Sequence, residues 1–259
     1  MSSTNNTVVR AQNLGKTFGS GPESVTALSG IDLAIQSGEF VSLIGPSGCG
    51  KSTLLRLIGD LTRPSTGKIT INGKSAEQAR LDRDYGIVFQ KATLLDWRTV
   101  TKNVELPLEI MDENDRSDRA AEMLQLVQLG DFKSHYPWQL SGGMQQRVAI
   151  ARALAFNPSL LLMDEPFGAL DEMTRELMQQ EVLRIWQETG TTVVFVTHSI
   201  PEAVFLSTRV VVMSARPGRI SQVIHTGLPH PRTEDTRESA AYYDKITEVR
   251  EALRQGDRQ

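Results

Sequence analysis

A glycine-rich turn between an apolar run and a helix-forming run constrains the fold of this chain more than any other feature. The apolar run covers residues 40–44, and the helix-forming run follows at 53–58. The turn fits the pattern G-x-x-x-x-G-K-[ST], in which backbone N–H groups and a helix N-terminus face a phosphate. It predicts a strand, a phosphate-binding loop and a helix, with a bare Gly-rich turn as the alternative. The residues concerned are Gly45, Pro46, Ser47, Gly48, Cys49, Gly50, Lys51, Ser52 and Thr53.

Two carboxylates at the end of a second apolar run complete a candidate nucleotide site. Residues 160–163 are apolar without alternation, which is typical of a strand covered on both faces of a parallel sheet. Because a buried unpaired charge is costly, Asp164 and Glu165 are expected at the strand end. Asp164 would hold Mg²⁺ together with Ser52, and Glu165 would polarise the attacking water. Lys51 would reach the β- and γ-phosphates of the nucleotide.

A third motif distinguishes among the classes of chain that contain such a loop. It reads Leu-Ser-Gly-Gly-Met-Gln-Gln-Arg over residues 140–147 and precedes an apolar helical run. Ser141 is a good N-cap, and Gly142 and Gly143 leave backbone N–H groups open to an anion. This motif closely resembles the signature of ATP-binding cassette (ABC) ATPases. In that family the signature contacts the γ-phosphate held by a partner subunit, which implies a head-to-tail dimer enclosing two ATP molecules.

Four further positions resemble motifs of the same family. Gln90 follows an apolar stretch and matches a glutamine that contacts Mg²⁺ and water. Asp171 ends a Gly-Ala-Leu-Asp run that matches a dimer-contacting loop, although Gly168 stands where many members have Ser. His198 follows an apolar strand and matches the histidine that senses the γ-phosphate. Phe18 resembles the aromatic residue that stacks on adenine, with a core position as the alternative.

The order of these patterns predicts an α/β fold with an antiparallel β subdomain and a helical insert. The resemblance implies that its core is a P-loop NTPase of the ABC-ATPase type. Strand-like alternation over 8–14 and 30–35, and a run closed by Asn72-Gly73, predict the antiparallel strands. Apolar runs beginning at Leu160, Val193 and Val210 predict the strands of the core. We expect an ABC ATPase domain over residues 8–228 with its helical insert at about 92–157, and a short C-terminal helical extension over 229–259.

Composition excludes several other classes of protein. The 259 residues have a formal net charge of −3, so no nucleic-acid partner is expected. No apolar run approaches the roughly 18–20 residues that span a bilayer, and residues 1–7 lack the pattern of a signal peptide. The single cysteine permits no internal disulfide, which favours a reducing compartment. We therefore expect a peripheral protein on the cytoplasmic face of the cell membrane.

The start of the helical insert offers a candidate surface for a membrane partner. Leu94, Leu95 and Trp97 form a possible apolar socket for a helix of a permease subunit. Packing of these side chains onto the core of their own chain is the alternative.

Three short strings point to one subgroup of the family. Residues 95–98, 103–104 and 214–220 are similar to the nitrate, sulfonate and taurine importer ATPases, a group that includes importers of pyrimidine vitamin precursors. The resemblance implies ATP-driven import of a small solute, with permease subunits and, indirectly, a solute-binding protein as partners. Export, or a non-transport ABC ATPase that remodels a cytosolic complex, are the alternatives.

Overall fold

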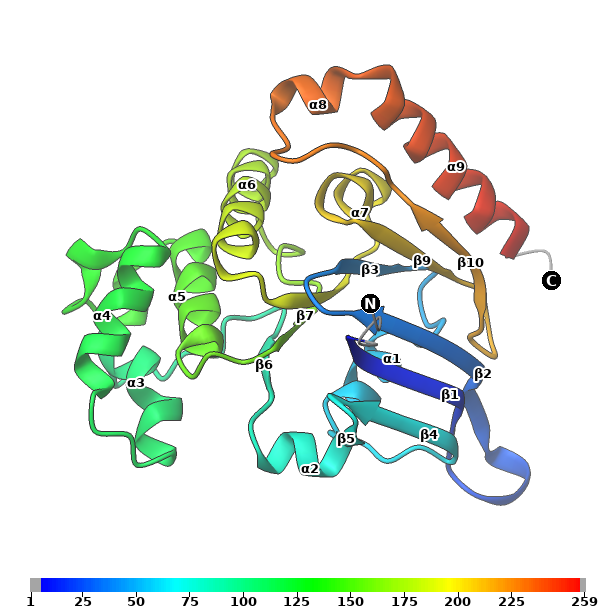
Figure 1. Cartoon of the computed structure of the whole chain (residues 1–259), viewed down its shortest axis with the longest axis horizontal. Coiled ribbons are helices and arrows are strands. Elements are labelled where there is room, and N and C mark those ends of the chain that lie inside the picture. Colours follow the sequence, from blue (N-terminus) through cyan, green and yellow to red (C-terminus); the bar gives the residue numbers. More distant parts are fainter. Residues whose placement is uncertain (1–5, 257–259) are drawn as a thin grey trace, which may run out of the picture.

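The strands of the chain form two sheets, one antiparallel and one mostly parallel (Figure 1). The computed structural model describes residues 6–256. Residues 1–5, where no signal peptide is expected, and 257–259, the end of the expected C-terminal extension, lie outside it. In the antiparallel sheet the order is β2 (Val25–Gln36), β1 (Thr7–Phe18), β4 (Thr66–Ile71), β5 (Lys74–Ser75). In the other it is β10 (Ile220–His225), β9 (Arg209–Met213), β3 (Phe40–Ile44), β8 (Thr192–Val196), β7 (Leu160–Asp164), β6 (Tyr85–Val88).

The antiparallel sheet contains the turn that the sequence predicts. Asn72 and Gly73 join β4 to β5 with φ angles of 51° and 77°. Two consecutive positive φ angles match the right-handed twist of the flanking strands, which is why Asn-Gly favours two-residue hairpins.

The parallel strands are buried on both faces, as the unbroken apolar run in β7 predicts. Leu160 and Leu162 face a cluster that also contains α1 (Lys51–Ile58) and the antiparallel sheet. Leu161 and Met163 face a second cluster, formed with the helices of the opposite side. The helices of that side are α5 (Gly142–Leu154), α6 (Glu172–Thr189), α7 (Ile200–Leu206) and α9 (Ala240–Gly256). Helix α1 therefore lies between the two sheets. Its N-terminus lies near the carboxyl end of β3, since only a short loop separates the two.

The helical insert projects to one side of the core, where Figure 1 shows it in green. Its helices are α3 (Val100–Ile110), α4 (Arg116–Leu126) and α5, and α3 and α4 pack against each other and against α5. Residues 92–99 form no helix, so the insert begins as a loop. The remaining helices are α2 (Ala76–Leu81) and α8 (Glu234–Glu238), with single 3₁₀ turns at Gly21–Glu23, Gly130–Phe132 and Pro137–Gln139.

The C-terminal segment after β10 packs on the core. Helix α9 contacts α7 and β9 and buries Tyr242, Ile246, Val249 and Ala252 in the same cluster as α5 and α6. Figure 1 shows α8 and α9 (orange to red) crossing the outer side of α7. No helix within residues 6–256 is both long and apolar enough to cross a membrane.

Candidate active site

Three neighbouring parallel strands deliver the predicted site residues to one edge of the sheet. Strand β3 lies next to β8, and β8 lies next to β7. The carboxyl ends of parallel strands meet at the same edge, which is where ligands bind in open α/β sheets. The phosphate-binding loop follows β3, Glu165 follows β7, and His198 follows β8 within two residues.

The loop between β3 and α1 has the backbone that the phosphate-binding pattern requires. Gly48 and Gly50 have φ angles of 76° and 96°, in the left-handed region that glycine adopts without steric cost. A side chain at Gly45 would lie 2.7 Å from both the Cys49 Sγ and the Met213 carbonyl oxygen. Left-handed residues among right-handed ones turn successive backbone N–H groups toward a common centre that binds anions. The loop therefore has the backbone geometry of an anion-binding turn.

Lys51 is folded into this loop and is only 7% exposed. Its Nζ donates hydrogen bonds to the carbonyl oxygens of Gly45 at 2.8 Å and Pro46 at 3.1 Å. A bound phosphate would compete with these carbonyls for the ammonium, which has three donors. Burial raises the pKa of the adjacent Cys49 thiol, and the charge of Lys51 opposes this shift. The thiol therefore stays protonated and packs as a small apolar group.

Ser52 and Asp164 are joined although they lie 112 positions apart in the sequence. The Ser52 Oγ donates a hydrogen bond of 2.8 Å to the Asp164 Oδ1. A hydroxyl and a carboxylate are oxygen ligands of the kind that Mg²⁺ takes, with phosphate oxygens and water in its other positions. Among the described residues no group of three or more His, Cys, Asp or Glu could hold a metal by itself. The oxygen donors of the Ser52–Asp164 pair fit Mg²⁺ by their chemistry.

Glu165 and His198 form the second pair at this edge. The His198 Nδ1 lies 3.2 Å from the Glu165 Oε2. Glu165 has a φ angle of 47°, and its backbone N–H donates to the Val196 carbonyl at 3.0 Å. A non-glycine residue in the left-handed region is uncommon, and such residues cluster at functional sites. The turn re-aims the Glu165 carboxylate toward the histidine.

Both pairs adjoin one cavity of about 620 Å³, although Asp164 itself is outside its described lining. Its lining includes Phe18, Lys51, Ser52, Glu165 and His198. The Phe18 ring is 45% exposed, and the Lys16 Nζ lies 4.9 Å from its centroid. The structure thus places Phe18 at the cavity rather than in the core, with a cation over its ring.

Gln90 lies outside the described lining of this cavity. It follows β6 at the far edge of the sheet, and its Nε2 would be 2.9 Å from a Cβ added to Gly168. The unusual glycine in the predicted dimer-contacting loop therefore leaves space for the Gln90 amide.

The signature residues do not line the cavity within the described chain. Ser141 caps α5, because its Oγ accepts a hydrogen bond from the Met144 N–H at 3.3 Å. Asp171 caps α6 by accepting from the Thr174 N–H at 3.0 Å, and this backbone hydrogen bond lowers the pKa of Asp171.

The start of α5 contacts the start of α6, because a Cβ on Gly143 would lie 2.8 Å from Thr174. Gly142 and Gly143 thus sit beside the α6 start and away from their own phosphate loop.

Sequence reasoning missed one cationic residue of the cavity, Arg216. Its Nε donates to the Gly48 carbonyl at 3.3 Å, and its side chain lines the cavity. A Cβ on Gly218 would lie 1.9 Å from the Cys49 carbonyl oxygen, so this segment packs tightly on the phosphate loop. The signal available was the Arg-Pro-Gly-Arg run at 216–219, which the sequence links only to a subgroup.

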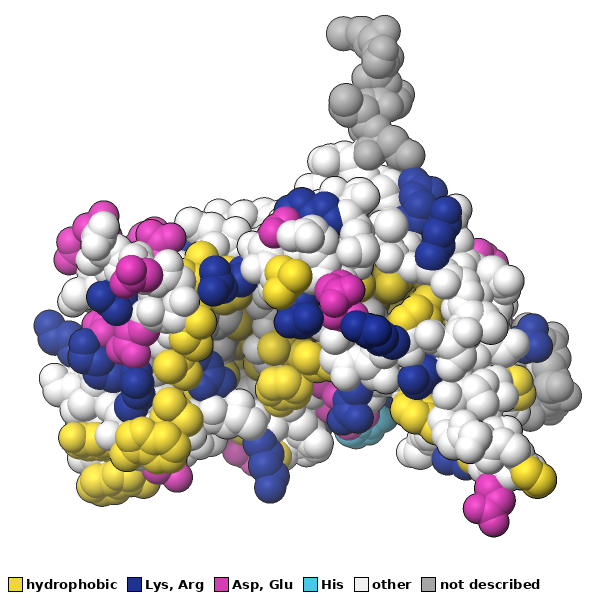
Figure 2. Space-filling view, turned by 90° about the horizontal axis from the view of Figure 1, so that it is seen from below, with side chains coloured by type: hydrophobic (Ala, Val, Ile, Leu, Met, Phe, Trp, Pro, Cys, Tyr) yellow, Lys and Arg dark blue, Asp and Glu magenta, His cyan; other side chains and the backbone are white. Residues whose placement is uncertain are grey.

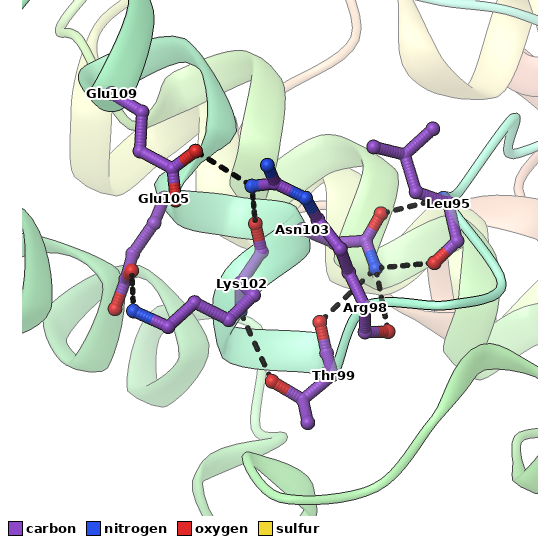
Figure 3. Close-up of polar contacts among 7 residues, drawn as sticks. All are labelled: Leu95, Arg98, Thr99, Lys102, Asn103, Glu105 and Glu109. Carbon is purple, nitrogen blue, oxygen red and sulfur yellow. Dashed lines mark hydrogen bonds and ion pairs between the residues drawn. The ribbon is translucent and has the colours of Figure 1, made fainter.

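The start of the helical insert divides its apolar side chains between core and surface. Leu94 is half-buried and packs against the core cluster, whereas Trp97 is 75% exposed. Buried Asn103 holds the loop between them: its Oδ1 accepts from the Leu95 N–H at 2.7 Å. Its Nδ2 donates to the carbonyls of Leu95, Arg98 and Thr99 at 3.0–3.1 Å (Figure 3).

A second exposed aromatic segment adjoins this loop. Tyr136 and Trp138 are 38% and 70% exposed, with their rings stacked at 6.2 Å. The Val100 N–H donates to the His135 carbonyl at 2.8 Å, which fastens this segment to the start of α3. Figure 2 shows hydrophobic side chains gathered over the end of the molecule that the insert forms.

Known proteins resemble this chain over most of its length. The family described as "ABC transporter" matches residues 28–168. The taurine import ATP-binding protein TauB of Rhizobium johnstonii is 52% identical over 199 residues, 76% of this chain and 75% of that protein. The aliphatic sulfonates import ATP-binding protein SsuB of Bacillus cereus is 43% identical over 228 residues, 88% of this chain and 90% of that protein.

A solved structure shows the same fold. It is an ATP-binding cassette in a dimeric post-hydrolysis state bound to ADP and Pi, with a TM-score of 0.72 and 39% identity. The match covers 84% of this chain and 98% of that one. Fold, cradle and relatives agree with the expectation drawn from the signature motif. This chain belongs to the ABC transporter family of ATP-binding proteins and is an ABC-type ATPase.

Proposed function

We propose that this chain is the ATP-hydrolysing motor subunit of a multi-subunit ABC importer. The observation that carries the hydrolytic part is one cavity lined by residues of the phosphate loop, by Ser52 and by the Glu165–His198 pair, with Asp164 hydrogen-bonded to Ser52. The names of relatives that import taurine and aliphatic sulfonates support uptake of a small solute. The proposal also includes nitrate and pyrimidine precursors as candidate solutes.

The cavity would bind ATP along its length. Phe18 would stack on adenine while its other side meets the Lys16 ammonium. Residues Gly45, Pro46, Ser47, Gly48, Cys49, Gly50 and Thr53 would surround the phosphates with Lys51 and Ser52. Mg²⁺ would be held by Ser52 and Asp164, with Gln90 as a further contact, and would neutralise charge on the β- and γ-phosphates. Lys51 would exchange its bonds to loop carbonyls for bonds to phosphate oxygens.

Glu165 would act as the base that polarises the attacking water. Glu165 lines the cavity, and its carboxylate lies 3.2 Å from the His198 ring nitrogen. His198 would orient Glu165 and contact the γ-phosphate, so that both groups are arranged before the reaction. Positioned general bases of this kind contribute about 10²- to 10⁴-fold to a rate.

A second copy of the chain would complete each site. Ser141, Gly142 and Gly143 lie outside their own cavity. Ser141 and Gly142 are exposed and Gly143 is buried, and backbone N–H groups of this helix start would face an anion. The partner's γ-phosphate would supply that anion, and Asp171 would lie at the same dimer contact. ATP binds both subunits at once in this arrangement, so it stabilises the closed dimer by its differential affinity.

The helical insert would transmit closure to membrane subunits. Trp97, Tyr136 and Trp138 would contact a helix of the permease. Leu94 and Leu95 would pack beneath the loop, between it and the rest of the chain. Large exposed aromatic side chains of this kind dominate protein interfaces. The chain would then act at the cytoplasmic face of the membrane as a peripheral subunit, with a solute-binding protein as an indirect partner.

The first experiment compares wild type with Glu165→Gln. ATP hydrolysis is measured, and ATP-dependent dimerisation is followed by light scattering after gel filtration. We expect wild type to hydrolyse ATP and Glu165→Gln to bind ATP, hydrolyse it slowly and remain a closed dimer. Glu77→Gln, an exposed acid on α2, is the matched control. Unchanged turnover in Glu165→Gln would exclude Glu165 as the base.

The import part needs a separate experiment. Affinity purification of the tagged chain from membranes should retain permease subunits, and a Trp97→Ala variant should retain less of them. Recovery of ribosomes or DNA instead would favour the non-transport alternative.

A further inference from the structure

One arginine of the C-terminal extension, Arg237, contacts both α6 and α7. Arg237, in α8, donates from its Nη2 to the Gln179 Oε1 at 2.5 Å. Its guanidinium carbon also lies 3.6 Å from the centroid of the Phe205 ring, in α7. Gln179 is a residue of α6 and is only 4% exposed. The extension is therefore bonded to a buried amide and does more than cover apolar surface.

The buried amide continues the hydrogen-bond chain toward the active site. The Gln179 Nε2 donates to the Glu202 Oε1 at 3.1 Å. The other carboxylate oxygen of Glu202 accepts a hydrogen bond from the Thr197 Oγ1. The Thr197 Oγ1 in turn accepts from the Ser199 N–H at 3.0 Å. The two residues that flank His198 are thus tied to Glu202.

Burial makes this chain of contacts costly to break. Glu202 and Thr197 are 6% and 2% exposed. Burial raises the pKa of Glu202, and the hydrogen bonds from Thr197 and Gln179 lower it. A buried carboxylate that lost one of these donors would be left with an unsatisfied oxygen, which is unfavourable in a buried site.

Glu202 also adjoins the reacting groups in space. Glu165, His198, Thr197 and Glu202 line one small cavity of about 20 Å³. A movement of Glu202 would therefore change the distance between the Glu165 and His198 side chains, which is 3.2 Å.

We propose that the C-terminal extension positions the catalytic histidine through the chain Arg237–Gln179–Glu202–Thr197. These four are positioning residues, since they act on His198 through the backbone of Thr197 to Ser199. The inference rests on the proposed roles of Glu165 and His198. It assigns the extension a role in hydrolysis, beyond its packing on α7 and β9.

The test compares Arg237→Gln with Arg250→Gln in the full-length chain. Both changes remove one positive charge from the extension, but Arg250 is exposed on α9 and outside the chain of contacts. ATP affinity, kcat per bound nucleotide and melting temperature are measured for each. We expect Arg237→Gln to lower kcat by about three- to tenfold with ATP affinity within twofold of wild type, because small displacements of a catalytic group slow a reaction more than they weaken binding. Arg237→Lys, which keeps a donor and the charge, should recover at least half of the lost kcat.

A purely structural role would lower only the melting temperature, because kcat is counted per bound nucleotide. A kcat within twofold of the Arg250→Gln value would overturn the inference. So would a parallel loss of ATP affinity, or a failure of Arg237→Lys to recover activity.

His198→Ala in the same series separates this inference from the proposed function. Normal hydrolysis by His198→Ala would remove the proposed role of His198 itself. Slow hydrolysis by His198→Ala beside normal hydrolysis by Arg237→Gln would overturn the C-terminal inference alone.

Discussion

The nucleotide cavity and the exposed end of the helical insert differ in where their side chains find partners. In the cavity, polar groups from distant parts of the chain already meet, as Ser52 meets Asp164 and Glu165 meets His198. At the insert, Asn103 satisfies the backbone of the loop, but Trp97 and Trp138 remain 75% and 70% exposed. The first region gathers polar groups around a cavity, and the second presents exposed apolar area of the kind found at interaction sites.

The contrast separates affinity for nucleotide from affinity for a partner protein. Changes in the cavity should alter ATP binding or hydrolysis in the isolated chain. Changes at the surface of the insert should alter only the assembled complex. Four substitutions test this separation, in order of decreasing expected effect.

Lys51→Ala should weaken ATP binding by about 100-fold, since a hydrogen bond to a charged group contributes about 1.5–3 kcal/mol and Lys51 has several donors. A nucleotide-binding titration measures this directly. Lys68→Ala, an exposed lysine on β4, should bind ATP as wild type does. A normal titration for Lys51→Ala would contradict its assignment to the phosphates.

Trp97→Ala should weaken permease binding by about 30-fold, because truncation of a central interface tryptophan costs about 2 kcal/mol or more. ATP hydrolysis by the isolated chain should stay unchanged. Ile110→Ala, which removes a 67% exposed side chain at the C-terminal end of α3, is the control. Equal permease binding by the two variants would place the interface elsewhere.

Phe18→Ala should raise the KM for ATP about tenfold with kcat unchanged, since stacking of a base on an aromatic ring contributes about 1–3 kcal/mol. Phe18→Tyr should keep the wild-type KM. Steady-state kinetics and thermal melting distinguish this outcome from packing of Phe18 in the core. In that case Phe18→Ala would have a lower melting temperature and an unchanged KM.

Ser141→Ala should lower the stability of the chain by about 1 kcal/mol through loss of a helix cap. It should also weaken the ATP-dependent dimer by about fivefold, the equivalent of one hydrogen bond. Ser75→Ala removes the cap of α2, where the Ser75 Oγ accepts from the Gln78 N–H at 3.1 Å. Ser75→Ala should lower the stability measured by denaturation and leave the ATP-dependent dimerisation measured by light scattering unchanged. Equal dimerisation of Ser75→Ala and Ser141→Ala would contradict the proposed role of the signature.

Sequence patterns predicted the parts of the fold and site that depend on local order along the chain. The strand–loop–helix at residues 40–58 is present, the apolar run of β7 is buried on both faces, and Asn72-Gly73 forms the hairpin turn. Each of these features depends on a few adjacent residues, because backbone conformation and strand burial act locally.

Other features escaped the sequence because they depend on contacts between distant segments. Strand β10 alternates too weakly to be predicted, and it forms because β9 offers a free edge. Arg216 enters the cavity because its segment packs on the phosphate loop 168 positions earlier in the chain. The partition of Leu94 inward and Trp97 outward was likewise open, since both are apolar and three residues apart.

The sequence by itself determined the chemistry that this chain carries and the family to which it belongs. The glycines, Lys51 and the paired carboxylates are recognised by residue type and short spacing, and both are visible in the sequence without the structure. Only the tertiary structure decided which of those groups meet, which apolar side chains remain exposed, and how Arg237 reaches the segment that holds His198. Such contacts join residues far apart in sequence, and they exist only once the core has packed around them.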